Sequence, residues 1–141
     1  MKASHLISFA CGVLATLGIV ATVGQTQAEP PAHVYELRMY HTMPGKLEAL
    51  KARFRDHTIA SFNSHDMKSI GYWVPQDAPN SENLLIYILE HKSREAGTKN
   101  WAAFNADPVW MKAKAESEVN GKLVDHVDDY YMNPTDFSKL K

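Results

Sequence analysis

The residues from Leu84 to His91, with the sequence LLIYILEH, constrain the fold more than any other part of the chain. Six consecutive apolar side chains between a polar, turn-rich segment and a helix cap are typical of a buried strand. Successive side chains of a strand point to opposite faces, so a run of this kind needs cover on both faces. The chain must therefore cover both faces of a sheet, either by its own elements or with a second molecule.

Periodicity and turn residues predict a strand, a helix, two strands, a helix and a last strand. Ser93 is the expected N-cap of the second helix, and Asp107 followed by Pro108 is expected to interrupt that helix by providing a new cap and a first-turn proline. The expected ranges are 34–41, 46–64, 70–74, 84–91 and 123–132. The second helix is expected to follow Ser93 and carry Trp101 and Phe104, with a further segment that holds Trp110.

This order predicts the α+β class with a ferredoxin-like βαββαβ arrangement, four antiparallel strands carrying both helices on one face. The other face would remain uncovered. A second copy of the sheet is the obvious cover, which predicts a homodimer.

The N-terminal segment is not expected to be part of the folded domain. A short basic opening precedes a nearly continuous apolar run over residues 6–23, and small residues stand before a possible cut after Ala28. We expect residues 1–28 to be a signal peptide, residues 29–33 a linker and residues 34–141 the domain. About 18 apolar residues also reach the lower limit for a membrane anchor, so membrane contact is expected only if the segment stays uncleaved. Either outcome takes the domain out of the cytosol, and the expected location is periplasmic or secreted.

Composition excludes several classes of function. Fifteen Lys and Arg residues against sixteen Asp and Glu residues give a net charge near −1, with no basic cluster, which disfavours nucleic acid as a partner. The one cysteine, Cys11, lies in the N-terminal apolar run, so the predicted domain has no disulfide, thiolate nucleophile or cysteine metal site. None of its histidines forms an HxH, HxxxH or HExxH pair, and no glycine-rich phosphate loop is present. The sequence thus predicts no metal site and no cofactor, although a haem, which needs only one axial histidine, stays an alternative.

Two residues of the first strand are candidates for ligand chemistry. Glu36 and Arg38 lie two positions apart and so share a face, where together they can orient an acidic or enolate-like ligand. The alternative is a structural ion pair within the sheet or at the dimer interface. His57, at the edge of the apolar stripe of the first helix, is a candidate proton-exchanging base, with a hydrogen-bonded structural histidine as its alternative.

Aromatic side chains are the remaining candidates. Tyr40, Trp73 and Trp101 are expected to line a pocket for a flat organic molecule, although aromatic residues in a small domain usually fill the core.

The same residues carry a family resemblance. The stretch from Tyr35 to Tyr40, YELRMY, followed by Pro44-Gly45-Lys46, resembles the opening signature of the NIPSNAP family. Further matches in the same order cover nearly the whole predicted domain. They are His57, Gly71-Tyr72-Trp73, Asn83, Asp107-Pro108-x-Trp110 and Pro134-Thr135-x-Phe137-Ser138. The third strand departs from the family, since it reads Tyr87-Ile88-Leu89-Glu90-His91 where the family commonly has His-Leu-Trp-x-Tyr.

The resemblance implies the dimeric α+β barrel fold and says less about activity. Family members act as recruitment or signalling proteins, while related barrels include cofactor-free monooxygenases and haem enzymes. Our first hypothesis is an exported homodimer with a cleft between sheet and helices that binds or transforms a small, partly aromatic molecule. Arg38 would hold an anionic or carbonyl oxygen there and His57 would exchange a proton. The alternatives are a non-enzymatic interaction module of the cell envelope, with the acidic Asp125, Asp128 and Asp129 on its last strand, and a haem or metal protein.

Overall fold

The computed structural model describes residues 33–140. The predicted signal peptide, residues 1–28, and most of the predicted linker lie outside the described residues. Within residues 33–140, no helix combines the length and apolarity needed to cross a membrane.

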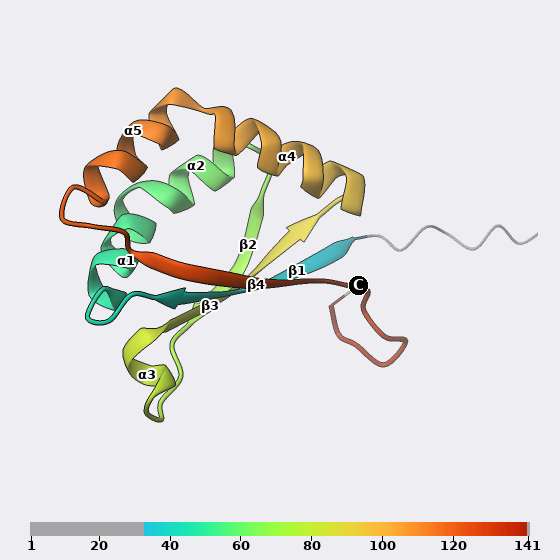
Figure 1. Ribbon diagram of the computed structural model, residues 1–141. Helices are drawn as coiled ribbons and strands as arrows, with labels where there is room; N and C mark the ends of the chain where they lie inside the picture. Colours follow the sequence, from blue (N-terminus) through green and yellow to red (C-terminus); the bar gives the residue numbers. More distant parts are fainter. Residues whose placement is uncertain (1–32, 141) are drawn as a thin grey trace, which may run out of the picture.

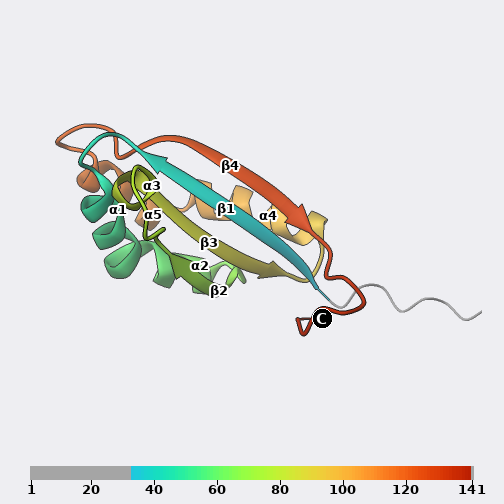
Figure 2. The ribbon, with the colours of Figure 1, turned by 90° about the horizontal axis from the view of Figure 1, so that it is seen from below.

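Four strands form one antiparallel sheet: β1 (Val34–Thr42), β2 (Lys68–Trp73), β3 (Leu84–His91) and β4 (Val124–Met132). Their spatial order is β2-β3-β1-β4. Figure 1 shows that α1 (Leu47–Arg53), α2 (Ile59–Ser64), α4 (Arg94–Ala106) and α5 (Pro108–Ser117) lie on one side of this sheet. Figure 2 shows the opposite face, which is open apart from the short helix α3 (Asn80–Asn83) at one end. The predicted ferredoxin-like arrangement is therefore confirmed. A π-helical turn (Phe54–Thr58) connects α1 to α2.

Local signals place the ends of several elements. Gly45 has a φ of 71°, a left-handed conformation that favours glycine, in the turn that separates β1 from α1. The Ser93 hydroxyl accepts a hydrogen bond from the amide of Ala96 and caps α4. Asp107 caps α5 by accepting from the amide of Val109, with Pro108 at the first helical position. The predicted interruption thus divides the second helix into α4 and α5.

The central strand β3 is covered unequally on its two faces. Leu85, Tyr87 and Leu89 point toward the helices and are buried against Phe54, Phe62 and Phe104. The side chains that alternate with them on the opposite face include Ile86 and Ile88, which remain partly exposed. This open face also carries Leu37 and Met39 of β1, as the strand register requires. One chain therefore supplies complete cover for only one of the two faces.

Candidate functional site

β1 lies between β3 and β4, and its helix-facing side chains begin the site. Register pairs Arg38 with Tyr87 on one side and with Asp129 on the other. Because alternate residues of a strand share a face, Glu36, Arg38 and Tyr40 all point toward the helices. The predicted shared face of Glu36 and Arg38 is confirmed.

The Glu36 carboxylate is buried, with 1% of its surface exposed, and three side chains bond to it. Arg38 Nη1 donates to Oε1 at 2.7 Å, and Trp101 Nε1 donates to Oε2 at 2.7 Å. His91 Nε2 lies 2.8 Å from the same Oε2. Burial alone would raise the pKa of Glu36, but these hydrogen bonds and the charge of Arg38 outweigh it and lower that pKa. Glu36 is therefore an ionised carboxylate that holds groups from β1, β3 and α4 in place.

The Arg38 guanidinium is held between this carboxylate and aromatic rings. Its Cζ atom lies 4.2 Å from the ring centroid of Trp101 and 5.5 Å from that of Tyr40. Burial would lower the pKa of Arg38, but its electrostatic interactions with Tyr40 and Tyr87 and its contact with Glu36 raise it, so the group stays charged. Among the residues described, none is a hydrogen-bond partner for Arg38 Nε. That atom is buried, but the Arg38 side chain keeps 16% exposure and bonds to Glu36 through Nη1, so the rest of the guanidinium edge can donate into the space beside it.

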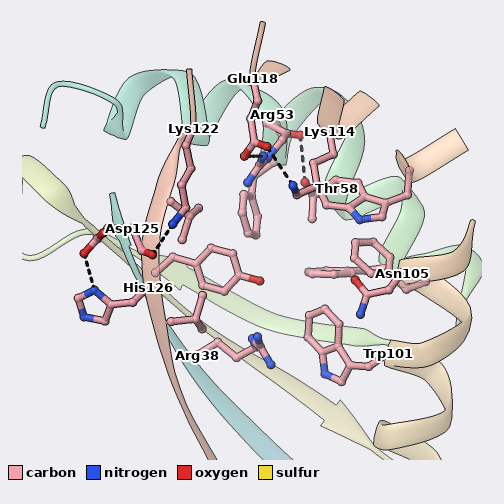
Figure 3. Close-up of a pocket in the computed structure, with 17 residues that line it drawn as sticks. Arg38, Arg53, Thr58, Trp101, Asn105, Lys114, Glu118, Lys122, Asp125 and His126 are labelled. Carbon is pink, nitrogen blue, oxygen red and sulfur yellow. Dashed lines mark hydrogen bonds and ion pairs between the residues drawn. The ribbon is translucent and has the colours of Figure 1, made fainter. Parts of the chain in front are cut away.

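A cavity of about 500 Å³ opens beside Arg38, between the sheet and the helices. Figure 3 shows Arg38 and Trp101 at one end and Arg53, Lys114 and Glu118 at the other. The walls combine aromatic rings with charged groups, and four cationic side chains face the cavity against two carboxylates. The aromatic lining residues are Tyr40, Phe54, Phe62, Trp101, Phe104 and Trp110, and the charged ones are Arg38, Arg53, Lys114, Glu118, Lys122 and Asp125.

The π-helical turn shapes the far end of the cavity. Arg53 is 3% exposed and donates from Nη1 to Glu118 Oε1 at 3.0 Å, so α1 is tied to the end of α5. The Thr58 hydroxyl donates to the carbonyl oxygen of Arg53 at 3.2 Å and satisfies a backbone group inside the turn. Turns of π-helix are common at functional sites because they reposition side chains along a helix. Here both Arg53 and Thr58 face the cavity.

The structure brings four of the six predicted site residues together. Arg38, Tyr40 and Trp101 line the cavity, and Glu36 lies directly behind them. The other two lie elsewhere. Trp73 is 49% exposed and lines a separate hollow with Tyr72 and Phe54.

His57 is exposed and lines a shallow depression with Asp56 and Ala60, outside the Arg38 cavity. Consecutive helical residues point about 100° apart, so the inward direction of its neighbour Thr58 turns His57 away from the core.

Two important residues did not stand out in the sequence. His91 is fully buried against Glu36 although 55 positions separate them, and only the pairing of β1 with β3 brings them together. Arg53 is 65 positions from Glu118. A charged residue on an otherwise apolar helical stripe was the one available sign that Arg53 points inward.

The family of this chain follows from its similarity to known proteins. The NIPSNAP family model matches residues 35–139. This range includes all four strands of the sheet, apart from Val34 at the start of β1. This chain belongs to the NIPSNAP family.

Solved structures of NIPSNAP proteins share the fold. A NIPSNAP family protein of unknown function from Agrobacterium tumefaciens is 24% identical, with a TM-score of 0.68, over 80% of this chain and 97% of that one. A second one from the same organism is 24% identical with a TM-score of 0.67, over 77% of this chain and 99% of that chain. An uncharacterised NIPSNAP-like domain protein from Burkholderia xenovorans is 19% identical with a TM-score of 0.65, over 77% and 90% of the two chains. These likenesses confirm the predicted fold class. Among proteins with curated descriptions, none matches the chain.

Proposed function

We propose that this NIPSNAP domain binds a small, flat organic anion in the cavity beside Arg38. The observation that carries the proposal is the state of Arg38, which is charged, stacked on Trp101, lines the cavity and keeps 16% of its side-chain surface exposed. A planar guanidinium binds a carboxylate or enolate oxygen through short, charge-assisted hydrogen bonds. Glu36 is a positioning residue in this proposal, because it fixes both Arg38 and Trp101 through hydrogen bonds of 2.7 Å.

The rest of the cavity supports this ligand class. Its cationic side chains outnumber its carboxylates even when Glu36 is included, which favours an anion. Its aromatic rings favour a flat molecule, and about 500 Å³ lies within the range of about 300–1,000 Å³ typical of small-molecule sites.

The proposal concerns binding and assigns no reaction. The predicted proton exchange by His57 gains no support from the geometry, since that exposed side chain lies outside the cavity. Binding by Arg38 and proton transfer by His57 are therefore separate hypotheses.

Matched aromatic probes test the proposal directly. Binding of 2-naphthoate and of neutral 2-naphthamide is measured by quenching of tryptophan fluorescence. We expect the carboxylate to bind more tightly in the native protein, because only it can accept a charge-assisted bond from Arg38. Replacement of Arg38 with Met should weaken naphthoate binding about 10- to 100-fold, which corresponds to the loss of one hydrogen bond between charged groups. Naphthamide binding should change much less.

Two further variants make the result interpretable. Arg38→Lys keeps the charge that Glu36 needs but removes the planar fork, so it should fold and still bind naphthoate more weakly. Lys112→Met removes an exposed cation outside the cavity and should bind like the native protein. Equal binding of the acid and the amide, or native binding by Arg38→Lys, would contradict the proposal.

The residues at the cavity do not fit a haem. Of the described histidines only His126 lines the cavity, and its Nδ1 lies 2.8 Å from Asp125 Oδ2. Figure 3 shows that ring on the side of β4 away from Arg38 and Trp101. An axial ligand facing an apolar pocket, which a haem requires, is therefore missing from the cavity walls in the described part of the chain.

The interaction-module alternative has one observation in its favour, the partly exposed apolar side chains of the open sheet face. We propose that a second copy of the chain covers this face, in agreement with the predicted homodimer. The apolar side chains Leu37, Met39, Ile86 and Ile88 support the proposal, because such a surface is better covered than left in water. Of the acidic residues of β4, Asp125 and Asp128 each contact a histidine, so they are less available to a partner protein than their sequence indicates.

Export and dimerisation can be tested in one experiment. Native mass spectrometry on protein produced from the full-length gene in a bacterial host reports cleavage, oligomeric state and any retained ligand together. We expect a dimer of chains that begin at Glu29. A monomer would refute the dimer, an uncleaved chain would refute the signal peptide, and neither result would affect the naphthoate test.

A further inference from the structure

Pairing of β1 with β4 brings two histidines and an aspartate together at one end of the sheet. The register sets His41 opposite His126, and their rings stack with centroids 4.2 Å apart and an angle of 9° between the planes. Asp128 lies two residues after His126 and so projects from the same face of β4. Its Oδ2 atom is 3.2 Å from His41 Nε2.

These three side chains form a set of metal ligands. We propose that His41, His126 and Asp128 bind one divalent transition-metal ion of the zinc type. One ligand atom from each residue lies within 4.8 Å of the other two. Bonds of about 2.0–2.1 Å in a tetrahedral site place ligand atoms about 3.3 Å apart. The pair formed by His41 and Asp128 already has this separation, and rotation of the exposed His126 side chain can close the remaining gap.

A second carboxylate supports this assignment. Metal-bound histidines usually donate their other ring N–H to a carboxylate or carbonyl, which fixes the tautomer that coordinates the ion. Asp125 Oδ2 lies 2.8 Å from His126 Nδ1 and fits that role, leaving His126 Nε2 as the coordinating atom.

The donor set indicates the class of ion. Two imidazole nitrogens and one carboxylate suit zinc and its neighbours in the first transition row, whereas calcium and magnesium prefer oxygen ligands throughout. Three protein ligands also leave a coordination position for water or another small ligand. The site lies on the open face of β1 and β4, whereas Arg38 points toward the helices. His126 and Asp125 also border the Arg38 cavity, but neither contacts Arg38, and the metal proposal does not rest on the proposed anion.

The pairing of distant residues explains why the ligand set is not visible as a motif. His41 and Asp128 are 87 positions apart. His41 and His126 are also far apart in sequence, so they form none of the close spacings by which metal sites are found in sequences. The pairing of β1 with β4 holds them together, as a helical turn does for an HxxxH pair.

Isothermal titration calorimetry with zinc chloride tests the site, on protein from which any affinity tag has been removed. We expect one zinc ion per chain with a micromolar or smaller dissociation constant at pH 7.4. His41→Ala and His126→Ala should each weaken binding at least about tenfold, since each removes a ligand. Asp128→Asn should also weaken it. Calcium and magnesium should give no saturable heat.

A control and a spectroscopic readout complete the experiment. His57→Ala removes an exposed histidine from a helix on the other face of the sheet and should leave zinc affinity unchanged. Cobalt(II) bound at three protein ligands and one water gives visible absorption bands, which should be present in the native protein and in His57→Ala and absent from His41→Ala. Far-ultraviolet circular dichroism of the metal-free variants checks that they remain folded. Millimolar binding, or unchanged binding in both histidine variants, would overturn the proposal.

Discussion

Replacement of Glu36 with Gln should destabilise the domain strongly although the two side chains have nearly the same size. The carboxylate is 1% exposed and accepts bonds from Arg38 and Trp101, with His91 at 2.8 Å. An amide offers one oxygen and presents an NH₂ group where a donor already points. The change also leaves Arg38 partly buried without its counter-ion.

The magnitude follows from these lost contacts. Removal of one partner from a buried ion pair costs about 3–5 kcal/mol. We take about 3 kcal/mol, because the Arg38 side chain retains 16% exposure and some access to water. A domain of about 100 residues loses about 4 °C in Tm for each kcal/mol, so the expected decrease is about 12 °C.

Thermal unfolding followed by circular dichroism at pH 7 measures this decrease. Glu48→Gln is the matched control, because Glu48 is 81% exposed and pairs only with Lys51 one turn away, and its Tm should change by less than about 2 °C. Trp101→Phe removes a single donor to Glu36 and should fall between the two. A Glu36→Gln protein that melts within about 3 °C of the native one would refute the view that this carboxylate organises the site.

Three further predictions concern neighbouring features of the structure. The pKa of Glu36 is lowered in the folded state, so its stabilising contribution is fully present above the ordinary Glu pKa of about 4.3 and is lost as the pH falls through the folded-state pKa. The difference in Tm between native and Glu36→Gln protein should therefore stay constant from pH 7 to about pH 5 and become smaller in more acidic buffer. Gly97→Ala should destabilise the folded domain by about 1–3 kcal/mol, although the same change usually stabilises a helix. The new methyl group would lie 2.8 Å from the Tyr131 hydroxyl and 3.1 Å from His91. Adding Tyr131→Phe should restore part of the lost free energy of unfolding, measured by urea titration. Asp107→Ala should lower the Tm by about 4 °C through loss of the cap of α5, whereas Asp107→Asn, which keeps an accepting oxygen, should stay close to native.

The fold was predictable because its signals are local. The apolar run from Leu84 to His91 is a strand with those bounds, and the capping residues Ser93 and Asp107 begin helices where their chemistry indicates. The differences are small. The first strand extends one residue further, to Thr42, and the first helix contains a π-helical turn that a regular helical period does not anticipate. The second strand covers Lys68–Trp73, not the predicted 70–74, and the predicted polar connection contains the short helix α3.

The site was predictable only in part, because it depends on contacts between distant residues. The alternation of β1 correctly placed Glu36, Arg38 and Tyr40 on one face. The identity of the groups above that face is set by strand order and helix packing, which is why the roles of His91 and Arg53 were not visible in the sequence. The exposure of His57 has the same origin, since an edge position on a helical stripe can fall on either side of the boundary with solvent.

The position of β1 has a consequence for the order in which the molecule can assemble. This strand is the first of the described elements, yet its neighbours in the sheet are β3 and β4, and β4 is the last of the described elements in chain order. Loop closure over about 90 residues is needed before Arg38 lies opposite Asp129, and the entropy cost of closing so long a loop slows folding. The emerging chain consequently cannot complete its sheet until β4 has been made. A frameshift or cut before Val124 would remove one wall of the cavity and expose an unpaired edge of the strand that carries the site.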